Sequence, residues 1–585
     1  MTLHLEPDRK ALRQLRDVAR GVAAADLVIS GGALANVFTG ELQEGWGLAM
    51  AAGRVAFVGP DAEVDARAGE GSARVQLAGD VVAPGLIEGH THLTRVRVSD
   101  FADAQVRAGV TTTVVESMEY AAILGPEGLR LFLAEAAQVA GRLLYTVSGL
   151  IMIDPEQSAR IEVEAWAQLL DSPGVVGVGE IYWADLLRGH ERTERLIQAA
   201  LARGLAVSGH GAGARPAGIN AMAASGIGSD HEGIDADDVL QRLRVGLHAL
   251  ARHGATRQDL PAIAHLWQQG KIDLSRLGLV TDGVEPADLG EGRSLNAVVA
   301  KAVELGLPPV SALRLASRNV AEHFGLGRWL GGLGPGMLAD VVVLPRAGRL
   351  ITFQPRLVFL GGRPPEPSPS SRYPDWLSHT TRLGALPAAL LDRPLPGRWR
   401  AMELQTPTVT REVESDGCSD LLCVCLARDG SGRGFRGLLR GFGVSGAAVA
   451  ISSPWELNAV LIVGAAPIEM ALAARRLVEL GGGVVVTREG RVEAEYAAPV
   501  AGLYSVKPLN EVVSEVAAVN RAMQTLGCTS PNPILTLETL TTGAIPFLRI
   551  FPGGYRRLRD GAILGLEWES TLSVEAAAGP REPRC

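Results

Sequence analysis

Six histidine and carboxylate side chains follow short apolar runs in the sequence. They are His90, His92, Glu180, His210, His231 and Asp282. Imidazole and carboxylate groups bind divalent metal ions, and four imidazoles with two carboxylates could hold two ions with Glu180 between them. Because paired ions lower the pKa of a water molecule, this set predicts metal-dependent hydrolysis.

The spacing and order of these residues support the prediction. His90 and His92 stand two positions apart at the end of LIEGHTH, and residues i and i+2 of a strand lie on the same face. A single histidine at a strand end is more often a structural hydrogen-bonding residue than a ligand. The order HxH, Glu, His, His, Asp on successive strand ends, however, makes coincidence a poor explanation.

Strands that alternate with helices must position these residues. From Val81 to about Gly325, short β-rich runs alternate with stretches of helical period, which predicts repeated βα units and a parallel sheet. Seven strands are evident, and we expect an eighth between Gly254 and Leu274. Closure into a (β/α)8 TIM barrel brings all the strand ends to one rim, where the active sites of such barrels are built.

Further units are predicted around this α/β barrel, which we place at residues 81–330. An amphipathic helix at 8–24 and alternating strands suggest a small β-sheet that resumes after the barrel, and a Pro/Ser-rich stretch indicates a linker. In the last unit, GVVVTREGRVEAEY is predicted as one strand. The predicted units outside the barrel are 1–80, the return to the small sheet at 331–370, the linker at 371–398 and a second α/β domain at 399–585.

Several sequence runs resemble the bacterial adenine deaminase branch of the amidohydrolase superfamily. They are VVAPGLIEGHTHL, GVGE, SGHGAG, SDHEG, LVTDG and GLGPGMLADVVVL, followed near the C-terminus by ELGGGVVV, PVAGLYSVKP and LGCTSPNPILTLETLTTGAIPFLRI. The resemblance covers nearly the whole chain. It implies a distorted barrel, a small β-sandwich split by that barrel, and the C-terminal domain of this family.

The resemblance also implies a cofactor and a reaction, the deamination of adenine to hypoxanthine and ammonia. Two ions of Mn²⁺, Fe²⁺ or Zn²⁺ would be held in one site: the first by His90, His92 and Asp282, the second by His210 and His231, with Glu180 as the bridge. Asp282 would accept a proton as metal-bound hydroxide attacks the ring, and then pass it to the leaving nitrogen. Glu232 is a candidate to hydrogen-bond a ring nitrogen; the alternative is a carboxylate at a helix start.

Several positions depart from the pattern of this family. Glu116, Ser117, Met118 and Glu119 occur where the family has a segment like DPHE, so a pocket imidazole is missing. Gly283 follows Asp282 in place of a second Asp, and Arg293 replaces a His. The segment ISSPWELN replaces a His-Asp-Ser-His-Asn run, of which only Asn458 remains. We therefore take Met118, Glu119 and Arg293 as candidate substrate-binding residues. Arg293 could favour an acidic substrate, or it is a solvated residue at a helix start.

Two alternatives stay open beside adenine deamination. The first is a related amidohydrolase that acts on another cyclic amidine or amide, such as a modified purine, a pteridine or a hydantoin-like ring, because sites built on hydrogen bonds discriminate strongly between substrates. The second is a non-catalytic scaffold. The intact set of six residues argues against the scaffold, since buried histidines and carboxylates without a metal ion would cost stability.

The composition favours a small-molecule substrate over nucleic acid or a membrane as the binding partner. The net charge of −8, from 56 basic and 64 acidic residues, provides no basic surface for nucleic acid or an anionic membrane. The five Cys lack the spacing of a zinc site or a disulfide framework, and the N-terminus lacks the apolar run of a signal peptide. We expect a cytoplasmic protein with no membrane span, and the resemblance implies a homo-oligomer, a dimer or higher.

Overall fold

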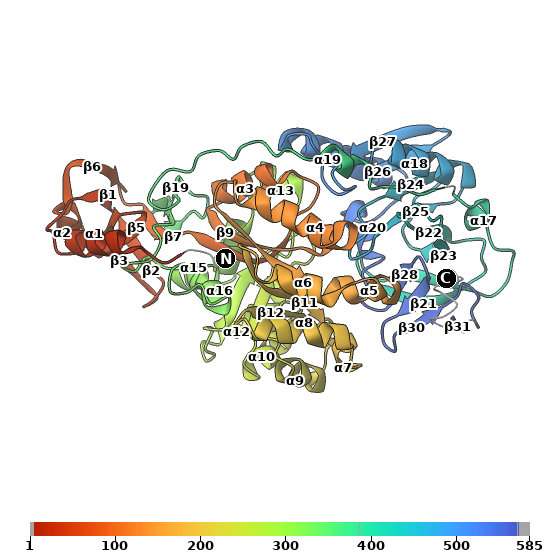
Figure 1. Cartoon of the computed structure of the whole chain (residues 1–585), viewed down its shortest axis with the longest axis horizontal. Coiled ribbons are helices and arrows are strands. Elements are labelled where there is room, and N and C mark those ends of the chain that lie inside the picture. The colour runs from red at the N-terminus through yellow and green to blue at the C-terminus, as the bar shows by residue number, and fades with distance from the viewer. Residues whose placement is uncertain (1–4, 385, 570, 573–585) are drawn as a thin grey trace.

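The computed structural model describes residues 5–384, 386–569 and 571–572. The outermost residues of the first and last predicted units, 1–4 and 573–585, lie outside the described residues. The chain forms an elongated molecule in which a small β-rich part, a central barrel and a C-terminal part follow one another (Figure 1). No helix in the described part of the chain is both long and apolar enough to cross a membrane.

Eight parallel strands form the central barrel, as predicted. They are hydrogen-bonded in chain order, and helices follow most of them on the outside. The strands are β8 (Leu86–His92), β9 (Val110–Glu116), β10 (Arg142–Ser148), β11 (Val175–Tyr182), β12 (Ala206–His210), β13 (Ser229–Asp230), β14 (His248–Arg252) and β15 (Leu277–Val280). The longer outer helices are α3 (Val98–Arg107), α4 (Met118–Ala136), α6 (Val163–Leu169), α8 (Glu191–Leu201), α9 (Pro216–Ala224), α10 (Ala236–Arg244), α14 (Leu295–Glu304), α15 (Pro309–Leu315) and α16 (Arg318–His323).

The predicted position of the eighth strand was wrong. That strand is β14, which ends at Arg252, before the window of 254–274. The window instead holds two single-turn helices, α11 (Leu260–Ile263) and α12 (His265–Gln268). The sequence HALAR is short and rich in Ala, which has a low strand propensity, so the tertiary pairing of β14 with β13 and β15 decides its conformation.

The barrel is distorted at the seam between β8 and β15. Glu88 lies in this seam, where its carboxylate accepts hydrogen bonds from the backbone N–H groups of His90 and Thr281, both at 3.0 Å. The backbone N–H of Asp282 in turn donates to the carbonyl of His90 at 3.0 Å. A side chain thus replaces part of the regular ladder, and the seam holds Asp282 directly beside the HxH pair.

The small β-sandwich is split by the barrel, as predicted. β7 (Val81–Pro84) pairs in parallel with β2 (Ala33–Asn36) and antiparallel with β16 (Val341–Leu344), so strands from before and after the barrel share one sheet. The predicted helix at 8–24 is shorter, α1 (Arg9–Ala19). The other strands of the two layers are β1 (Ala25–Ser30), β3 (Glu41–Glu44), β4 (Trp46–Ala51), β5 (Arg54–Pro60), β6 (Ala68–Gln76) and β19 (Leu357–Phe359).

The C-terminal part contains a mixed eight-stranded sheet covered by helices. The run predicted as one strand, GVVVTREGRVEAEY, is a hairpin that turns at Glu489 and Gly490, whose φ angles of 53° and 74° are those of a tight turn. The strands of the sheet are β20 (Trp399–Leu404), β21 (Thr410–Ser415), β22 (Leu421–Ala427), β23 (Gly434–Arg440), β24 (Ala447–Ile451), β25 (Ala459–Gly464), β26 (Gly483–Arg488) and β27 (Arg491–Ala497). The helices are α18 (Pro467–Glu479), α19 (Leu509–Thr525) and α20 (Pro533–Thr539), and a smaller sheet begins with β28 (Leu548–Phe551).

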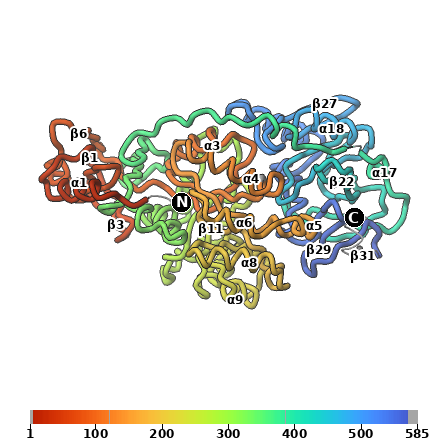
Figure 2. The backbone as a smooth tube through the Cα atoms, viewed as in Figure 1, coloured from red at the N-terminus to blue at the C-terminus, as the bar shows by residue number. Residues whose placement is uncertain are grey.

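An extended segment joins the small sandwich to the C-terminal part. After β19 the chain runs along one side of the barrel to the opposite end of the molecule (Figure 2). The backbone N–H of Ser368 donates to Asp103 at 3.0 Å, and that of Ser371 donates to Ser99 at 3.2 Å, so the segment is held against α3. The segment leads to the C-terminal part, which lies at the rim of the barrel where the predicted site residues are.

Candidate active site

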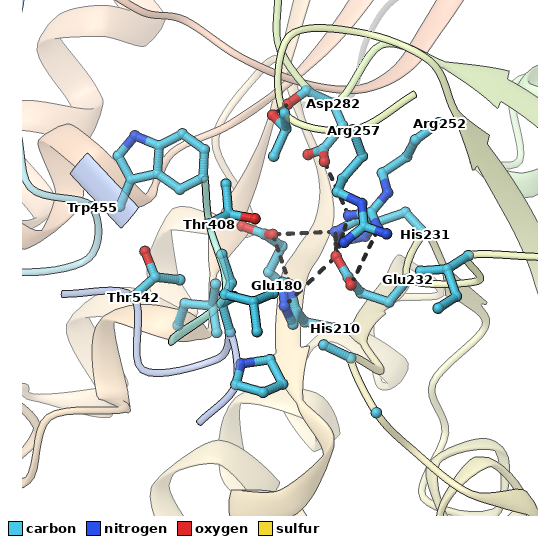
Figure 3. Close-up of a pocket in the computed structure, with 18 of the residues that line it drawn as sticks. Glu180, His210, His231, Glu232, Arg252, Arg257, Asp282, Thr408, Trp455 and Thr542 are labelled. Atoms are coloured by element: carbon cyan, nitrogen blue, oxygen red, sulfur yellow. Dashed lines mark hydrogen bonds and ion pairs between the residues drawn. The ribbon is translucent and has the colours of Figure 1, made fainter. Parts of the chain in front are cut away.

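The structure brings the six predicted metal-ligating residues together at the carboxyl ends of the barrel strands. Oε1 of Glu180 is the central atom. It lies 3.2 Å from Nδ1 of His210 and 3.5 Å from Nε2 of His231 (Figure 3). It also lies 3.9 Å from Nε2 of His90. These side chains come from four different strand ends, so barrel closure gathers residues that are up to 141 positions apart in the chain, from His90 to His231.

Asp282 completes the group beside the HxH pair. Its Oδ1 lies 3.1 Å from Nε2 of His90 and 3.4 Å from Nε2 of His92. The rings of His90 and His231 stack with centroids 3.9 Å apart. All six side chains are buried, which leaves little water to solvate the carboxylates.

Two of the carboxylates stand on strained backbone. Glu180 and Asp282 have φ angles of 45° and 58°, a region that residues with a side chain rarely adopt. At Glu180 the pairing of β11 with β12 shifts register between Val178 and Ile181. Strain of this kind persists where the surrounding structure imposes it, commonly at functional sites.

The electrostatics of the cluster favour ionised carboxylates. Burial alone would raise the pKa of Asp282, but hydrogen bonds with His90 and His92 and the charge of Arg252 outweigh it and hold that pKa well below its usual value. Burial lowers the pKa of His231 well below 6.5, and the neighbouring His90 acts in the same direction. His231 is therefore in the uncharged state that binds a metal ion, whereas for His90 and His210 the effect of burial is outweighed by the carboxylates around them, which raise the pKa of His90 to about 10 and that of His210 to about 9. A bound cation would have to displace those protons.

The donor atoms fit divalent metal ions. Three groups of three residues each offer ligand atoms within 4.8 Å of one another: His90 with His231 and Asp282, His90 with His92 and Glu180, and Glu180 with His210 and His231. Among the described residues, Oε2 of Glu180 and Nε2 of His210 are buried without a hydrogen-bond partner. Such unpaired buried atoms are costly unless a ligand satisfies them.

The sequence analysis missed two charged residues of this site. Arg252, at the end of β14, hydrogen-bonds both oxygens of Glu232 and lies 3.1 Å from Oδ2 of Asp282. Glu116, at the end of β9, has its Oε1 3.5 Å from Nδ1 of His90. Both stand at strand ends, the signal that identified the other six. Arg252 went unnoticed because β14 did, and Glu116 was noted only as a departure from a family pattern.

A cavity of about 300 Å³ opens beside the cluster, between the barrel and the C-terminal part. His92, Glu180, His210, His231 and Asp282 line it from the barrel. The C-terminal part lines the other side with Thr408, Val409, Trp455, Glu456, Thr542, Ile545, Pro546 and Phe547. The indole of Trp455 also stacks on the ring of His92. A volume of this size suits a small ligand.

Comparisons with known proteins agree with this architecture. Residues 81–364 match the amidohydrolase family, and residues 399–560 match the adenine deaminase C-terminal domain. The chain is 33% identical to the adenine deaminase of Moorella thermoacetica over 93% of this chain and 96% of that protein. The chain belongs to the adenine deaminase family. The adenine deaminase of Deinococcus deserti is 32% identical over 95% of this chain and 97% of its own length, and that of Cenarchaeum symbiosum is 31% identical over 94% of each.

The chain also matches a more distant solved structure. The N-acetylglucosamine-6-phosphate deacetylase from Pasteurella multocida is 15% identical, with a TM-score of 0.45 over 58% of this chain and all of that one. Membership of the adenine deaminase family makes this chain a hydrolase of the amidohydrolase type, and the amidohydrolase match implies a divalent metal.

The positions that depart from the adenine deaminase pattern lie at different distances from the cavity. Met118 lines it, whereas Glu119 lies behind His92 and contacts Nδ1 of that ring at 2.8 Å. Arg293 is not among the cavity-lining residues; its side chain is 48% exposed and pairs with Asp288 and Glu291. The structure therefore does not bring Arg293 to the cavity, and it places this residue as a solvated arginine just ahead of α14.

Asn458 also lies outside this cavity. It lines a second cavity with Gln157, whose side chain accepts a hydrogen bond from the Asn458 backbone N–H at 3.3 Å. The residues just before it, Trp455 and Glu456, are the ones that reach the site. The segment ISSPWELN, noted above only because it replaces a polar run, was the signal that could have found them.

Proposed function

We propose that this enzyme hydrolyses the exocyclic amino group of adenine to give hypoxanthine and ammonia. The observation that carries the proposal is the convergence of four imidazoles on Glu180 and Asp282 beside a small cavity. The adenine deaminase relatives that match over more than nine-tenths of the chain support the choice of substrate.

Two divalent ions are proposed to bind among His90, His92, Glu180, His210, His231 and Asp282. When bound, such ions activate water for attack on the ring carbon. Buried residues that hydrogen-bond the other ring nitrogen of a histidine would hold these ligands in place. Glu119, which contacts Nδ1 of His92, is one of them. The six side chains are buried, and because water is excluded from the cluster the electrostatic interactions within it are stronger.

Asp282 is proposed to move the proton. Its carboxylate is ionised, buried and within 3.5 Å of two of the proposed ligands, so it is placed to accept a proton from the attacking water. It then passes that proton to the leaving nitrogen, which departs as ammonia. The second proton of the water goes to the ring nitrogen, so that the product carries a C=O group beside a ring N–H. Glu232, which lines the cavity and is held by Arg252, is placed to accept a hydrogen bond from that ring N–H.

A second candidate is deamination or ring opening of another cyclic amidine or amide. The observation that favours it is the side of the cavity formed by Trp455 and Glu456, in a segment that departs from the family pattern. Polar groups that line a site select strongly among related rings. We propose this activity as the alternative to be tested beside adenine.

Metal analysis and a substrate screen test both candidates. Protein produced with added Mn²⁺ should contain at least about one ion per chain, and Glu180→Gln should reduce this content. Glu70→Gln, at an exposed position of β6, is the matched control and should not. The metal-loaded protein should release ammonia from adenine.

The outcomes separate the candidates. Ammonia that is released slowly from adenine and faster from another ring would favour the alternative activity. A metal content below about one ion per chain, unchanged in Glu180→Gln, would contradict both and favour a scaffold.

A further inference from the structure

The C-terminal part of the chain forms a largely apolar wall of the cavity, with a few polar side chains that the proposed mechanism does not use. In Figure 3, Trp455 and Thr542 lie on one side of Glu180, and His231 and Arg252 lie on the other. A ligand attacked at the metal cluster therefore has its far side against side chains from β24–β25 and from the segment after α20. These side chains are placed to determine which rings fit.

Glu456 supplies the carboxyl group of this wall. It is fully buried, and its Oε2 accepts a hydrogen bond from the backbone N–H of Gly543 at 3.0 Å. Its Oε1 has no hydrogen-bond partner among the residues that the structure describes. Burial raises the pKa of Glu456 to about 8, and the nearby charge of Glu180 acts in the same direction. The carboxyl group is thus held in place by one oxygen while the other is unsatisfied.

The backbone at Glu456 is held in an unusual conformation. Its φ angle is 68°, which is unfavourable for a residue with a side chain. The side chain of Gln157, from the barrel, donates to the carbonyl of Glu456 at 2.8 Å. A buried carboxyl on strained backbone, fixed from both parts of the molecule, is difficult to explain by stability alone.

Thr542 supplies the second unsatisfied group. It is 1% exposed, and within the described ranges its Oγ1 also has no hydrogen-bond partner. It precedes Gly543, the residue that holds Glu456, so the two side chains flank the same short backbone segment. Both line the cavity. An unpaired buried group of this kind is destabilising unless a ligand pairs with it.

We propose that Glu456 and Thr542 form a recognition site for one edge of a planar nitrogen heterocycle, an edge with a ring N–H next to a ring acceptor atom. One carboxyl group and one hydroxyl group together present a donor and an acceptor, which matches such an edge. In adenine, that edge is N9–H beside N3. The inference rests on the proposed function for the orientation of the ring and selects free bases over compounds substituted at this nitrogen.

Variants and analogues tested together distinguish recognition from a structural role. Glu456→Gln keeps an oxygen for the Gly543 N–H, and Thr542→Val keeps the shape of the side chain. For metal-loaded protein, kcat/KM is measured with adenine, with 9-methyladenine, which lacks N9–H, and with 3-deazaadenine, which lacks N3. Calorimetric Kd values for the same three rings supply a readout that does not need turnover.

The expected result is an interaction between variant and analogue. Each variant should lower kcat/KM for adenine about tenfold, and each should lower it far less for the analogue that lacks the matching ring atom. Thr542→Ser should restore activity toward that of the unsubstituted enzyme because it restores the hydroxyl. Glu70→Gln should match the unsubstituted enzyme with every ring.

Two results would overturn the inference. Equal losses for all three rings would mean that the residues only support the structure, and unchanged values would mean that they do not meet the ligand. Failure of the proposed function is distinguishable: adenine would then bind without releasing ammonia, and the Kd values would still report the recognition. If adenine did not bind at all, both the recognition site and the proposed function would be contradicted.

Discussion

The indole of Trp455 stacks on the imidazole of His92, with ring centroids 5.2 Å apart and planes inclined by 17°. His92 ends β8 of the barrel, and Trp455 follows β24 in the C-terminal part. The contact therefore joins a proposed metal ligand to a residue 363 positions later in the chain. It shows that the C-terminal part borders the site and contacts the residues that would bind the metal.

Removing this indole should impair catalysis. Trp455→Ala is expected to lower kcat/KM at least tenfold and the free energy of unfolding by about 3–5 kcal/mol, because the His92 ring loses its packing partner and a cavity remains. Trp455→Phe should retain most activity, since it keeps an aromatic face. Ammonia release and chemical denaturation measure the two effects. Trp376→Ala, at a residue that is 51% exposed, is the control, and an equal loss in that variant would contradict the prediction.

Arg252 should be essential for stability. It is buried between the carboxylates of Glu232 and Asp282, and Arg252→Met would leave both without their cation. The expected cost is about 3–5 kcal/mol in the free energy of unfolding, measured by denaturant titration. Arg203→Met removes an exposed pair with Asp171, which solvent screens, and should cost much less stability than Arg252→Met. Similar costs for the two variants would show that burial does not matter here.

Arg95 is expected to stabilise the packing of the barrel against the C-terminal part. It is 3% exposed and pairs with Glu285 at 2.9 Å and with Glu538 of α20 at 2.5 Å. Arg95→Met should lower the free energy of unfolding by about 3–5 kcal/mol and increase hydrogen exchange in α20, since Glu538 would be buried without its cation. Adding Glu538→Gln should recover part of the loss. No recovery in the double variant would mean that the ion pair with Glu538 is not the cause.

Acid should destabilise the fold through a histidine pair at the other end of the barrel. The rings of His248 and His323 lie 5.0 Å apart. Burial, aided by the charge of Arg276, lowers the pKa of His248 to about 4, and burial and His248 lower that of His323 to about 3. The unfolded chain binds protons at these residues near pH 6.5, whereas the folded chain does not, so stability is complete above about pH 6.5 and falls as the pH drops below it.

Thermal denaturation across that range tests this prediction. His323→Gln should make the melting temperature depend less steeply on pH between about 6.5 and 4, because one of the two groups no longer titrates. His379→Gln, at a residue that is not part of the pair, is the control. An unchanged slope in His323→Gln would show that the pair does not contribute to acid sensitivity.

The amino-acid sequence by itself determined the residues of the candidate metal site and the class of fold. Alternation along a strand places His90 and His92 on one face, and parallel strands end at one rim, so local pattern and general barrel geometry suffice to bring Glu180 and Asp282 to them. The same local reasoning identified the split of the small sandwich, since β7 and β16 both have the pattern of buried strands.

Only the tertiary structure decided how the rest of the site is built. Arg252 joins Glu232 to Asp282 because β14 is held between its neighbours, although its own sequence is a weak strand former. Trp455 and Glu456 reach the cavity because a separate part of the chain packs over the barrel rim. Contacts between residues hundreds of positions apart depend on how whole surfaces fit together, and no local period in the sequence encodes that fit.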